Sequence, residues 1–345
     1  MTDTLRTEIL DRLSEVTDPV KKRDLVSLGM INGLQINDGN VVFTIDIDPK
    51  RQTEMEILRK QVIKIVEHIK NVKSVSVVLT AEKPQARAIA PDVANIIVVS
   101  SAKGGVGKST VSINLAHALK KQGLRVGLLD GDIYGPSQPM MTGITDKPEM
   151  TEDKFILPPL HHDMPVMSIG FLISNNDTAL VWRGPMVQKA LFQMLCDVKW
   201  GTLDVLIIDL PPGTGDVQLT LAQKAPLTGA IVVSTPQDIA LIDAVKGISM
   251  FEKLNIPVLG LIENMSAFFC PNCDHESHIF GNGGAKSEAK KRNIPYLGGI
   301  PLDIDIRTCA DNGTPVVLEH PDSPSAKAFL DIARNLSETL LQKAA

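Results

Sequence analysis

The chain has 345 residues, of which 43% are apolar and 22% charged, enough to build one large domain and a smaller one. Its formal net charge of −5 disfavours nucleic acid or an anionic membrane as a partner held by bulk charge. The charged start, MTDTLRTEILDRL, lacks the apolar core of a secretory signal, and no segment approaches the roughly 18 apolar residues of a membrane span, so we expect a cytoplasmic protein.

The first 80 residues are predicted to form a small α+β domain. Apolar residues recur at helical spacing over 5–13 and again over 55–69. Between these helices, LQINDGNVVFTIDID (34–48) alternates in polarity around an Asp-Gly pair, which is typical of a β-hairpin turn. Residues 75–79 alternate in the same way and indicate a last strand.

Residues 81–93 are predicted to be a linker, because AEKPQARAIAPD contains two prolines and little apolar periodicity. From residue 94 onward, short apolar runs alternate with helical stretches. The runs are NIIVV, RVGLLD, PVMSIG, DVLIIDL, GAIVVST and IPVLGLIEN, and the helical stretches lie at 109–121, 185–198, 218–224 and 239–254. This alternation predicts an α/β domain over 94–345, with a mainly parallel, doubly wound sheet and ligands beyond the carboxyl ends of its strands.

A glycine-rich loop follows the first of these strands and leads into a helix, as in a P-loop. Its glycines allow backbone N–H groups to converge on a phosphate, and the positive end of the helix points there. Lys108 is expected to reach the β- and γ-phosphates of ATP, and the Ser109 hydroxyl to bind Mg²⁺. Ala102 replaces the usual first glycine of the pattern. The expected nucleotide-binding residues of the loop are Ala102, Lys103, Gly104, Gly105, Val106, Gly107, Lys108, Ser109 and Thr110.

Acidic residues at two strand ends are predicted to complete this site. Asp130 and Asp132 end RVGLLD and begin the loop after it, and Asp209 ends DVLIID. P-loop NTPases hold Mg²⁺ or its waters with an acidic residue placed in this way. We therefore expect the carboxylates to face the phosphate loop from neighbouring strands.

The loop carries a second lysine, Lys103, although one lysine already neutralises charge within the loop. This arrangement resembles the deviant Walker A motif of the superfamily that contains MinD, ParA and the nitrogenase iron protein. In that superfamily the early lysine reaches across a nucleotide-sandwich dimer to the partner's phosphates. The resemblance implies that Lys103 acts in trans, like an arginine finger, and that the protein is a homodimer.

Four cysteines in a cytoplasmic chain are thiols or metal ligands rather than a disulfide framework. Cys270 and Cys273 have the C-x-x-C spacing that lets two thiolates bind one metal centre, whereas Cys196 lies on an apolar helical stripe. A redox dithiol or half of a zinc site has the same spacing, although His275 lies too near Cys273 for the usual zinc pattern. Two chains together supply the four thiolates of a 4Fe–4S cluster. The pair His161–His162 lies in a poorly periodic segment, which indicates a surface loop rather than a metal site.

Taken together, the motifs resemble those of the Mrp/ApbC family of iron–sulfur cluster carrier ATPases. The shared stretches include AKGGVGKST, DGDIYGPS, IIDLPPGTGD and ENMSAFFCPNC. The resemblance implies ATP binding, slow hydrolysis, transfer of clusters to apoproteins and a homodimer that bridges one 4Fe–4S cluster through Cys270 and Cys273. It also implies that Asp132 positions the attacking water, that Asp209 is the Walker B acid and that Asn264 binds adenine.

The first domain is similar to a small domain of bacterial iron–sulfur assembly proteins, on the stretch DLVSLGMINGLQI. Many such domains carry a cysteine after the second hairpin strand, and this chain has none there, which favours partner docking over cluster binding. The alternative for the whole protein is a ParA- or MinD-like positioning ATPase whose C-x-x-C is a structural zinc or redox site. A metal-handling GTPase would need the guanine-specifying N-K-x-D motif, and the sequence has ENMS in the corresponding place.

Overall fold

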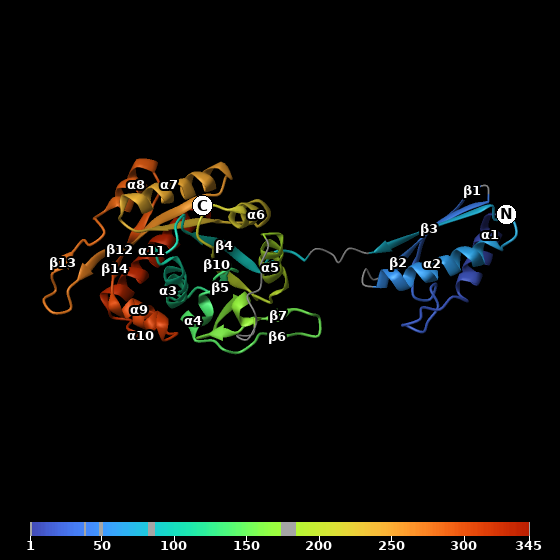
Figure 1. Cartoon of the computed structure of the whole chain (residues 1–345), viewed down its shortest axis with the longest axis horizontal. Coiled ribbons are helices and arrows are strands. Elements are labelled where there is room, and N and C mark those ends of the chain that lie inside the picture. Colours follow the sequence, from blue (N-terminus) through green and yellow to red (C-terminus); the bar gives the residue numbers. More distant parts are fainter. Residues whose placement is uncertain (1, 38, 48–50, 82–86, 174–183, 345) are drawn as a thin grey trace. The chain divides into compact units, whose positions relative to one another are not determined.

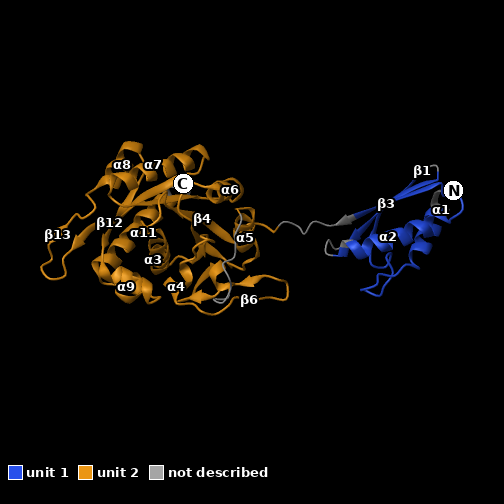
Figure 2. Ribbon diagram, viewed as in Figure 1, with its two compact units in different colours: residues 1–86 blue, residues 87–345 orange. Residues whose placement is uncertain are grey.

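The computed structural model describes residues 2–37, 39–47, 51–81, 87–173 and 184–344. The chain divides into two compact units, residues 1–86 and 87–345, each with its own core (Figure 2). Residues 82–86, within the predicted linker, and Asp38 of the predicted hairpin turn lie outside the described residues.

The smaller unit is a three-stranded sheet covered by two helices. Its strands, β1 (Ile31–Asn37), β2 (Asn40–Ile47) and β3 (Ser74–Ala81), lie in that order. β1 and β2 are antiparallel, as the alternating pattern predicts, and β3 is parallel to β2 because α2 (Gln52–Glu67) connects them. The apolar positions of α1 (Thr2–Leu13) and α2 face the sheet, so that Ile9, Met55 and Val62 are fully buried.

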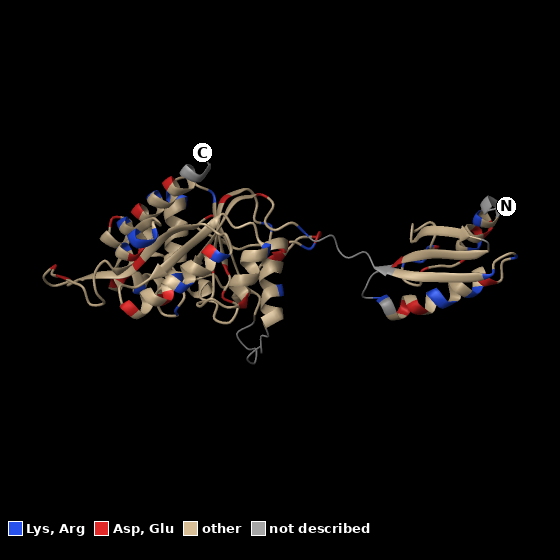
Figure 3. Ribbon diagram, turned by 90° about the horizontal axis from the view of Figure 1, so that it is seen from above, with Lys and Arg blue, Asp and Glu red and all other residues tan. Residues whose placement is uncertain are grey.

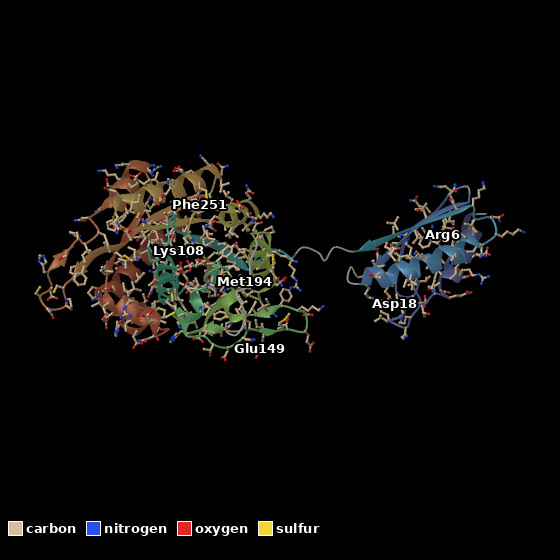
Figure 4. All side chains as sticks on the ribbon, in the orientation of Figure 1. Arg6, Asp18, Lys108, Glu149, Met194 and Phe251 are labelled. Atoms are coloured by element: carbon tan, nitrogen blue, oxygen red, sulfur yellow. The ribbon has the colours of Figure 1, made fainter. Side chains whose placement is uncertain are left out.

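A buried ion pair ties the start of α2 to the segment after α1. Asp18 has no exposed surface and accepts two hydrogen bonds of 2.9 Å from the Arg51 guanidinium. Its carboxylate also accepts the N–H groups of Val20 and Lys21. The Arg51 hydrogen bonds hold the pKa of Asp18 well below its usual range, so the carboxylate stays ionised inside the smaller unit (Figure 4).

The larger unit is a doubly wound α/β fold, and it confirms the predicted fold class. Its central sheet has the strand order β13-β12-β11-β4-β10-β5-β9-β8, with β14 beside β12. Every pairing among β4, β5, β9, β10, β11, β12 and β14 is parallel, and only the short edge strands β8 and β13 are antiparallel to their neighbours. The bounds are β4 (Val93–Ser100), β5 (Val126–Asp130), β8 (Leu160–His161), β9 (Met164–Ser168), β10 (Leu203–Asp209), β11 (Gly229–Ser234), β12 (Val258–Phe269), β13 (Glu276–Ser277) and β14 (Tyr296–Leu302).

Helices cover both faces of this sheet, with α7 and α8 on one side and α3, α4, α9 and α10 on the other (Figure 1). A short hairpin, β6 (Glu149–Met150) and β7 (Ile156–Leu157), lies apart from the sheet. The helices are α3 (Lys108–Lys121), α4 (Gln138–Thr142), α5 (Gly184–Asp197), α6 (Asp216–Lys224), α7 (Asp238–Lys253), α8 (Gly284–Arg292), α9 (Ile304–Asp311), α10 (Val316–Glu319) and α11 (Pro324–Ala344), with one 3₁₀ turn at Ile169–Phe171.

The C-terminal helix packs against the protein. Phe329, Ile332 and Leu336 of α11 are buried, and α11 lies against α3 and β14. Among the described residues, no helix is both long enough and apolar enough to cross a membrane.

The strand order brings the predicted motifs to one edge of the sheet. β4 lies between β10 and β11, and β5 lies on the other side of β10. Asp209 at the end of β10 is in register with Asp130 at the end of β5 and with Val99 of β4. The phosphate loop after β4 and the acids after β5 and β10 therefore share the carboxyl edge of three neighbouring strands, as the sequence predicts.

Two features differ from the sequence-based expectations. Residues from Arg87 pack on the larger unit, because the Arg87 guanidinium lies 4.0 Å from the centre of the Phe155 ring and bonds Asp197 at 2.9 Å. His161, expected on a surface loop, is a buried residue of β8 whose Nδ1 lies 2.8 Å from Nε2 of His117 in α3. Both contacts join segments far apart in the chain, which local periodicity does not detect.

Candidate functional site

The phosphate loop has a backbone that only glycine adopts easily. It runs from the end of β4 to Lys108, the first residue of α3. Gly105 and Gly107 have φ angles of +83° and +79°, in the left-handed region. A Cβ atom on Gly107 would also lie 2.3 Å from Nδ2 of Asn264, closer than atoms can approach. The loop therefore depends on glycine at position 107 both for its turn and for its contact with β12.

Asn264 lies against this loop. It is a buried residue of β12, and its side-chain amide donates a 2.8 Å hydrogen bond to the carbonyl of Val106. The predicted adenine-binding residue is thus attached to the back of the phosphate loop, 158 positions away in sequence. This bond connects β12 directly to the phosphate loop.

Lys108 and Asp209 form a buried ion pair. The lysine side chain is 6% exposed and the aspartate side chain is not exposed at all. The Lys108 ammonium donates to Asp209 Oδ1 and, at 3.2 Å, to Ser109 Oγ. Ser112 Oγ, from the second turn of α3, also donates to Asp209 Oδ1 at 3.0 Å. The P-loop lysine and the predicted Walker B acid are therefore in direct contact.

Asp130 and Asp132 have different surroundings although only one residue separates them. Asp130 is fully buried and accepts hydrogen bonds from the N–H groups of Ser137 and Gln138 and from Ser168 Oγ. Burial, and then the neighbouring Asp209, raise its pKa. Its contacts fix the loop after β5, which is a structural role.

Asp132 is the acid of this pair that faces outward into the site. Its side chain is only partly buried, and Oδ1 accepts the Gly135 N–H at 3.2 Å. Burial raises its pKa, while the nearby Lys108 charge lowers it. Asp132 is therefore free to bind a polar group at the surface of the site, whereas Asp130 is not.

Lys103 is exposed, in contrast to Lys108. Its carbonyl accepts a 3.0 Å hydrogen bond from Ser101 Oγ, and the Ser101 carbonyl accepts the Gly213 N–H at 2.8 Å from the segment after β10. These bonds hold the backbone on both sides of Ala102. No partner of the Lys103 ammonium is present in the described part of the chain, so its charge is directed to solvent.

Gln138 belongs to the site but carried no signal in the sequence. It is fully buried at the start of α4, and its Nε2 donates to Asp209 Oδ2 at 3.0 Å and to the Ser109 carbonyl at 3.2 Å. Its Oε1 is buried without a hydrogen-bond partner in the described structure. Gln138 thus joins the phosphate loop to the strand-end acid through its Nε2, and its buried oxygen remains available as an acceptor.

Cys270 and Cys273 lie in the tight turn that joins β12 to β13. The Cys270 carbonyl accepts the N–H groups of Cys273 and Asp274, at 3.3 and 2.9 Å, and Phe269 pairs with Glu276 across the hairpin. Cys273 is exposed and Cys270 is partly so. Hydrogen bonds from the Asn272 backbone and the Cys273 thiol lower the pKa of Cys270, which favours the thiolate that binds metals.

The other cysteines and the nearby histidines do not join this pair. Burial raises the pKa of both Cys196 and Cys309, which disfavours their thiolates. His278 has both ring nitrogens in contacts, Nδ1 with the Ser266 carbonyl and Nε2 with Asn282. Within the described residues, no group of three or more metal-binding side chains is assembled. Each chain can therefore supply two thiol ligands to a metal centre at this turn.

Family models match both units. A model described as an NUBPL iron-transfer P-loop NTPase matches residues 92–337, more than half of the chain. A model described as an iron-sulfur cluster assembly protein matches residues 6–79 of the smaller unit. These two matches correspond to the two compact units of the structure.

Curated relatives and solved structures agree with these models. An iron-sulfur cluster carrier protein of Aquifex aeolicus is 43% identical, over 96% of this chain and 99% of its own length. An iron-sulfur cluster transfer protein, NUBPL, of Dictyostelium discoideum is 50% identical over 75% of this chain and 80% of its own. A nucleotide-binding protein of Archaeoglobus fulgidus in complex with ADP superimposes with a TM-score of 0.60 at 38% identity, covering 69% of this chain and 93% of that one. The resemblance drawn from the motifs is confirmed, and the chain belongs to the NUBPL iron-transfer family of P-loop NTPases.

Proposed function

We propose that this protein is an ATP-dependent carrier that binds an iron–sulfur cluster at Cys270 and Cys273 and passes it to apoproteins. The observation that carries the proposal is the path of β12. This strand contains Asn264, whose side chain bonds the phosphate loop, and it leads directly into Cys270 six positions later. β12 thus joins the nucleotide site to the thiol pair, with an irregular turn of its backbone at Met265 (φ +58°) between them, which suits a carrier whose hold on its cargo depends on nucleotide. The names of the relatives point to the same cargo.

The residues of the site fit Mg²⁺ and ATP. The N–H groups of the loop and of the first turn of α3 form an anion cradle, and Ser109 and Asp209 offer the oxygens that Mg²⁺ prefers. The free Oε1 of Gln138 would accept a hydrogen bond from a metal-bound water. When bound, Mg²⁺ supplies charge neutralisation at the phosphates.

Three residues of the chain have separate roles in ATP binding and hydrolysis. When ATP enters, the Lys108 ammonium leaves Asp209 and binds the phosphates, because the carboxylate and the phosphates are anions that compete for it. Asp132, half-exposed beside the loop, orients the attacking water. Lys103, directed to solvent, reaches the phosphates of a second copy and completes the site only in a homodimer.

The cargo site is likewise completed by two copies. Two thiols in one chain leave half of a 4Fe–4S cluster without ligands, and two chains supply four. Symmetry then requires the C-x-x-C hairpins to meet on the two-fold axis, which places one cluster in each homodimer.

Anaerobic reconstitution tests this proposal. We expect about four irons and four sulfides per dimer in the wild-type protein, as a thiolate-bound 4Fe–4S cluster requires. Cys270→Ala or Cys273→Ala should lose the cluster, because each change removes two of the four thiolates in the dimer. Cys196→Ala is the matched control and should retain full iron. Retention of ATP binding in all three variants would show that they are folded.

Two results would contradict the carrier. A Cys270→Ala protein that still takes up a full cluster would exclude bridging by this pair. Stoichiometric zinc in place of iron, with ATP binding intact, would favour the positioning ATPase with a structural metal site.

A further inference from the structure

A cleft of about 600 Å³ lies at the base of the C-x-x-C hairpin. It is formed where β12, β14 and the start of α9 meet, at the end of the larger unit from which β13 projects (Figure 1). Cys270 is one of its lining residues. A segment bound in this cleft would therefore touch the residue that we assign to the cluster.

The walls of the cleft are apolar and accessible. Phe269 of β12 is 47% exposed and Ile304 of α9 is 57% exposed, and Leu302 and Pro301 also line the cleft. Large apolar side chains gathered at an exposed cleft are uncommon on a surface with no binding role.

The polar lining of the cleft is acidic. Asp274, Asp303 and Asp305 line it, and none of the described lysines or arginines does. Asp303 caps α9 through the Asp305 N–H at 2.9 Å and accepts from Ser325 Oγ, so its oxygens are engaged. Asp274 and Asp305 are exposed at the rim. Arg307, one turn along α9 from Ile304, bonds Asp311 at 2.6 Å rather than these carboxylates.

We infer that this cleft binds the recipient apoprotein, through a cysteine-bearing segment that carries a large apolar residue and flanking lysine or arginine. This inference rests on the proposed carrier function. The apolar residue fits between Phe269 and Ile304, and the basic residues meet Asp274 and Asp305. The adjacent cysteines of the segment are then held next to Cys270, where the cluster must be handed over.

The transfer is a ligand exchange with no change in electron count. Each recipient thiol loses a proton to solvent as its sulfur bonds an iron atom. Each carrier thiolate that leaves iron takes up a proton, so that four iron–sulfur bonds form as four break. Holding the incoming thiols beside the cluster converts an encounter between two molecules into a local step.

A second copy of this chain is a poorer occupant of the cleft. A segment of a second copy that carried its own Cys270 and Cys273 into the cleft would bring Asp274 and Glu276 beside those cysteines, rather than basic residues. Like charges brought together in this way are destabilising, whereas a basic segment neutralises them.

Peptide binding to the full-length, cluster-free protein tests the inference. The probe is a fluorescent 12-residue peptide with Cys-x-x-Cys, one leucine and three lysines. The control peptide has glutamates in place of the three lysines. We expect the lysine peptide to bind at least about tenfold more tightly at low salt, and its advantage to shrink in about 0.5 M salt because of screening.

Matched double variants locate the site. Ile304→Ser/Asp305→Asn removes the apolar wall and one rim charge, and should weaken the lysine peptide by about fivefold or more. Ile242→Ser/Asp243→Asn makes the same two changes in an Ile-Asp pair on α7, where Ile242 is 54% exposed, and should leave affinity unchanged.

The possible results separate the two proposals. Neither double variant touches a thiol, so both should load iron as the wild type does. Failure of the wild type to load a cluster would refute the carrier function. Normal loading with equal peptide affinity in both double variants would refute the docking site alone. A cleft variant that becomes monomeric in sedimentation while it still binds peptide would place a second copy in the cleft and also overturn the inference.

Discussion

At the scale of single residues, the two lysines of the phosphate loop have opposite surroundings. Lys108 is 6% exposed and bonds the buried Asp209, whereas Lys103, five positions earlier, is directed to solvent. Removing one partner of a buried ion pair leaves the other charge buried and unpaired, whereas removing an exposed lysine changes the free energy of unfolding little. The same substitution should thus have different consequences at the two positions.

We predict that Lys108→Ala abolishes ATP binding and destabilises the larger unit by up to about 3 kcal/mol, because Asp209 then lacks its cation. The loss is limited by Ser112 and Gln138, which still donate to the same carboxylate. Lys103→Ala should keep its melting temperature and most of its ATP affinity but lose hydrolysis. Calorimetry, equilibrium titration with an ATP analogue and phosphate release measure the three quantities.

Lys103→Arg is the control for charge at this position and should retain part of the hydrolysis. Equal loss of ATP affinity in Lys103→Ala and Lys108→Ala would mean that Lys103 binds phosphate within its own chain rather than in trans.

At the scale of elements, a pair of histidines joins α3 to β8. His117 and His161 are 1% and 6% exposed, and their facing nitrogens are 2.8 Å apart. Burial lowers the pKa of His117 to about 3 and that of His161 to about 4, so both are neutral in the folded protein. In the unfolded chain each histidine side chain has its ordinary pKa of about 6.5 and binds a proton when the pH is below that value. The free energy of unfolding should therefore fall as the pH drops below 6.5, and continue to fall until the folded pKa values are reached.

We predict that this pair lowers the free energy of unfolding of the larger unit by about 3 kcal/mol between pH 7.5 and 5.5, or about 1.4 kcal/mol for each histidine over that whole range. The double variant His117→Gln/His161→Asn places amide nitrogens near the same positions without a titrating group, and should lose that part of the pH dependence. Urea unfolding at the two pH values gives the difference. His320→Gln, at an exposed position, is the control and should keep the wild-type pH dependence. An unchanged slope in the double variant would show that the pair is protonated when folded.

At the scale of the whole molecule, the chain carries two independent cores. Acidic and basic residues are interspersed along the ribbons of both units (Figure 3). The smaller unit has no cysteine and no nucleotide motif, and its buried Asp18 carboxylate pairs with Arg51 of the same unit. We therefore expect the chemistry to belong to the larger unit alone.

We predict that a chain beginning at Arg87 folds, binds ATP and takes up a cluster. A chain beginning at Ala94, the domain start predicted from the sequence, should be less stable by about 2 kcal/mol. It lacks the backbone bonds of Ala90 to Leu195 and of Leu203 to Asp92, and each such bond contributes about 1 kcal/mol. Thermal unfolding compares the two chains. Equal stability would mean that residues 87–93 are a true linker, and failure of the first chain to load iron would assign cluster chemistry to the smaller unit.

Much of the fold and the site follows from local patterns. The apolar runs predict β4, β5, β9, β10 and β11 to within a few residues, because a strand buried on both faces must be apolar along its length. Gly107 and Lys108 are recognisable because the loop, its glycines and the helix start are contiguous. The C-x-x-C pair is recognisable for the same reason, since one turn holds both thiols.

The amino-acid sequence by itself thus determined the fold class, the phosphate loop, the strand-end acids and the thiol pair, because each strand, loop or turn among them is recognisable from a short contiguous segment. Only the tertiary structure decided that Gln138 bonds Asp209, 71 positions away, that His117 meets His161, and that an acidic, apolar cleft lies beside Cys270. The physical reason is that these contacts arise from the order of strands in the sheet and from the helices packed on it. Side chains with no local pattern become neighbours there because burial of the whole core, rather than any short segment, sets their positions.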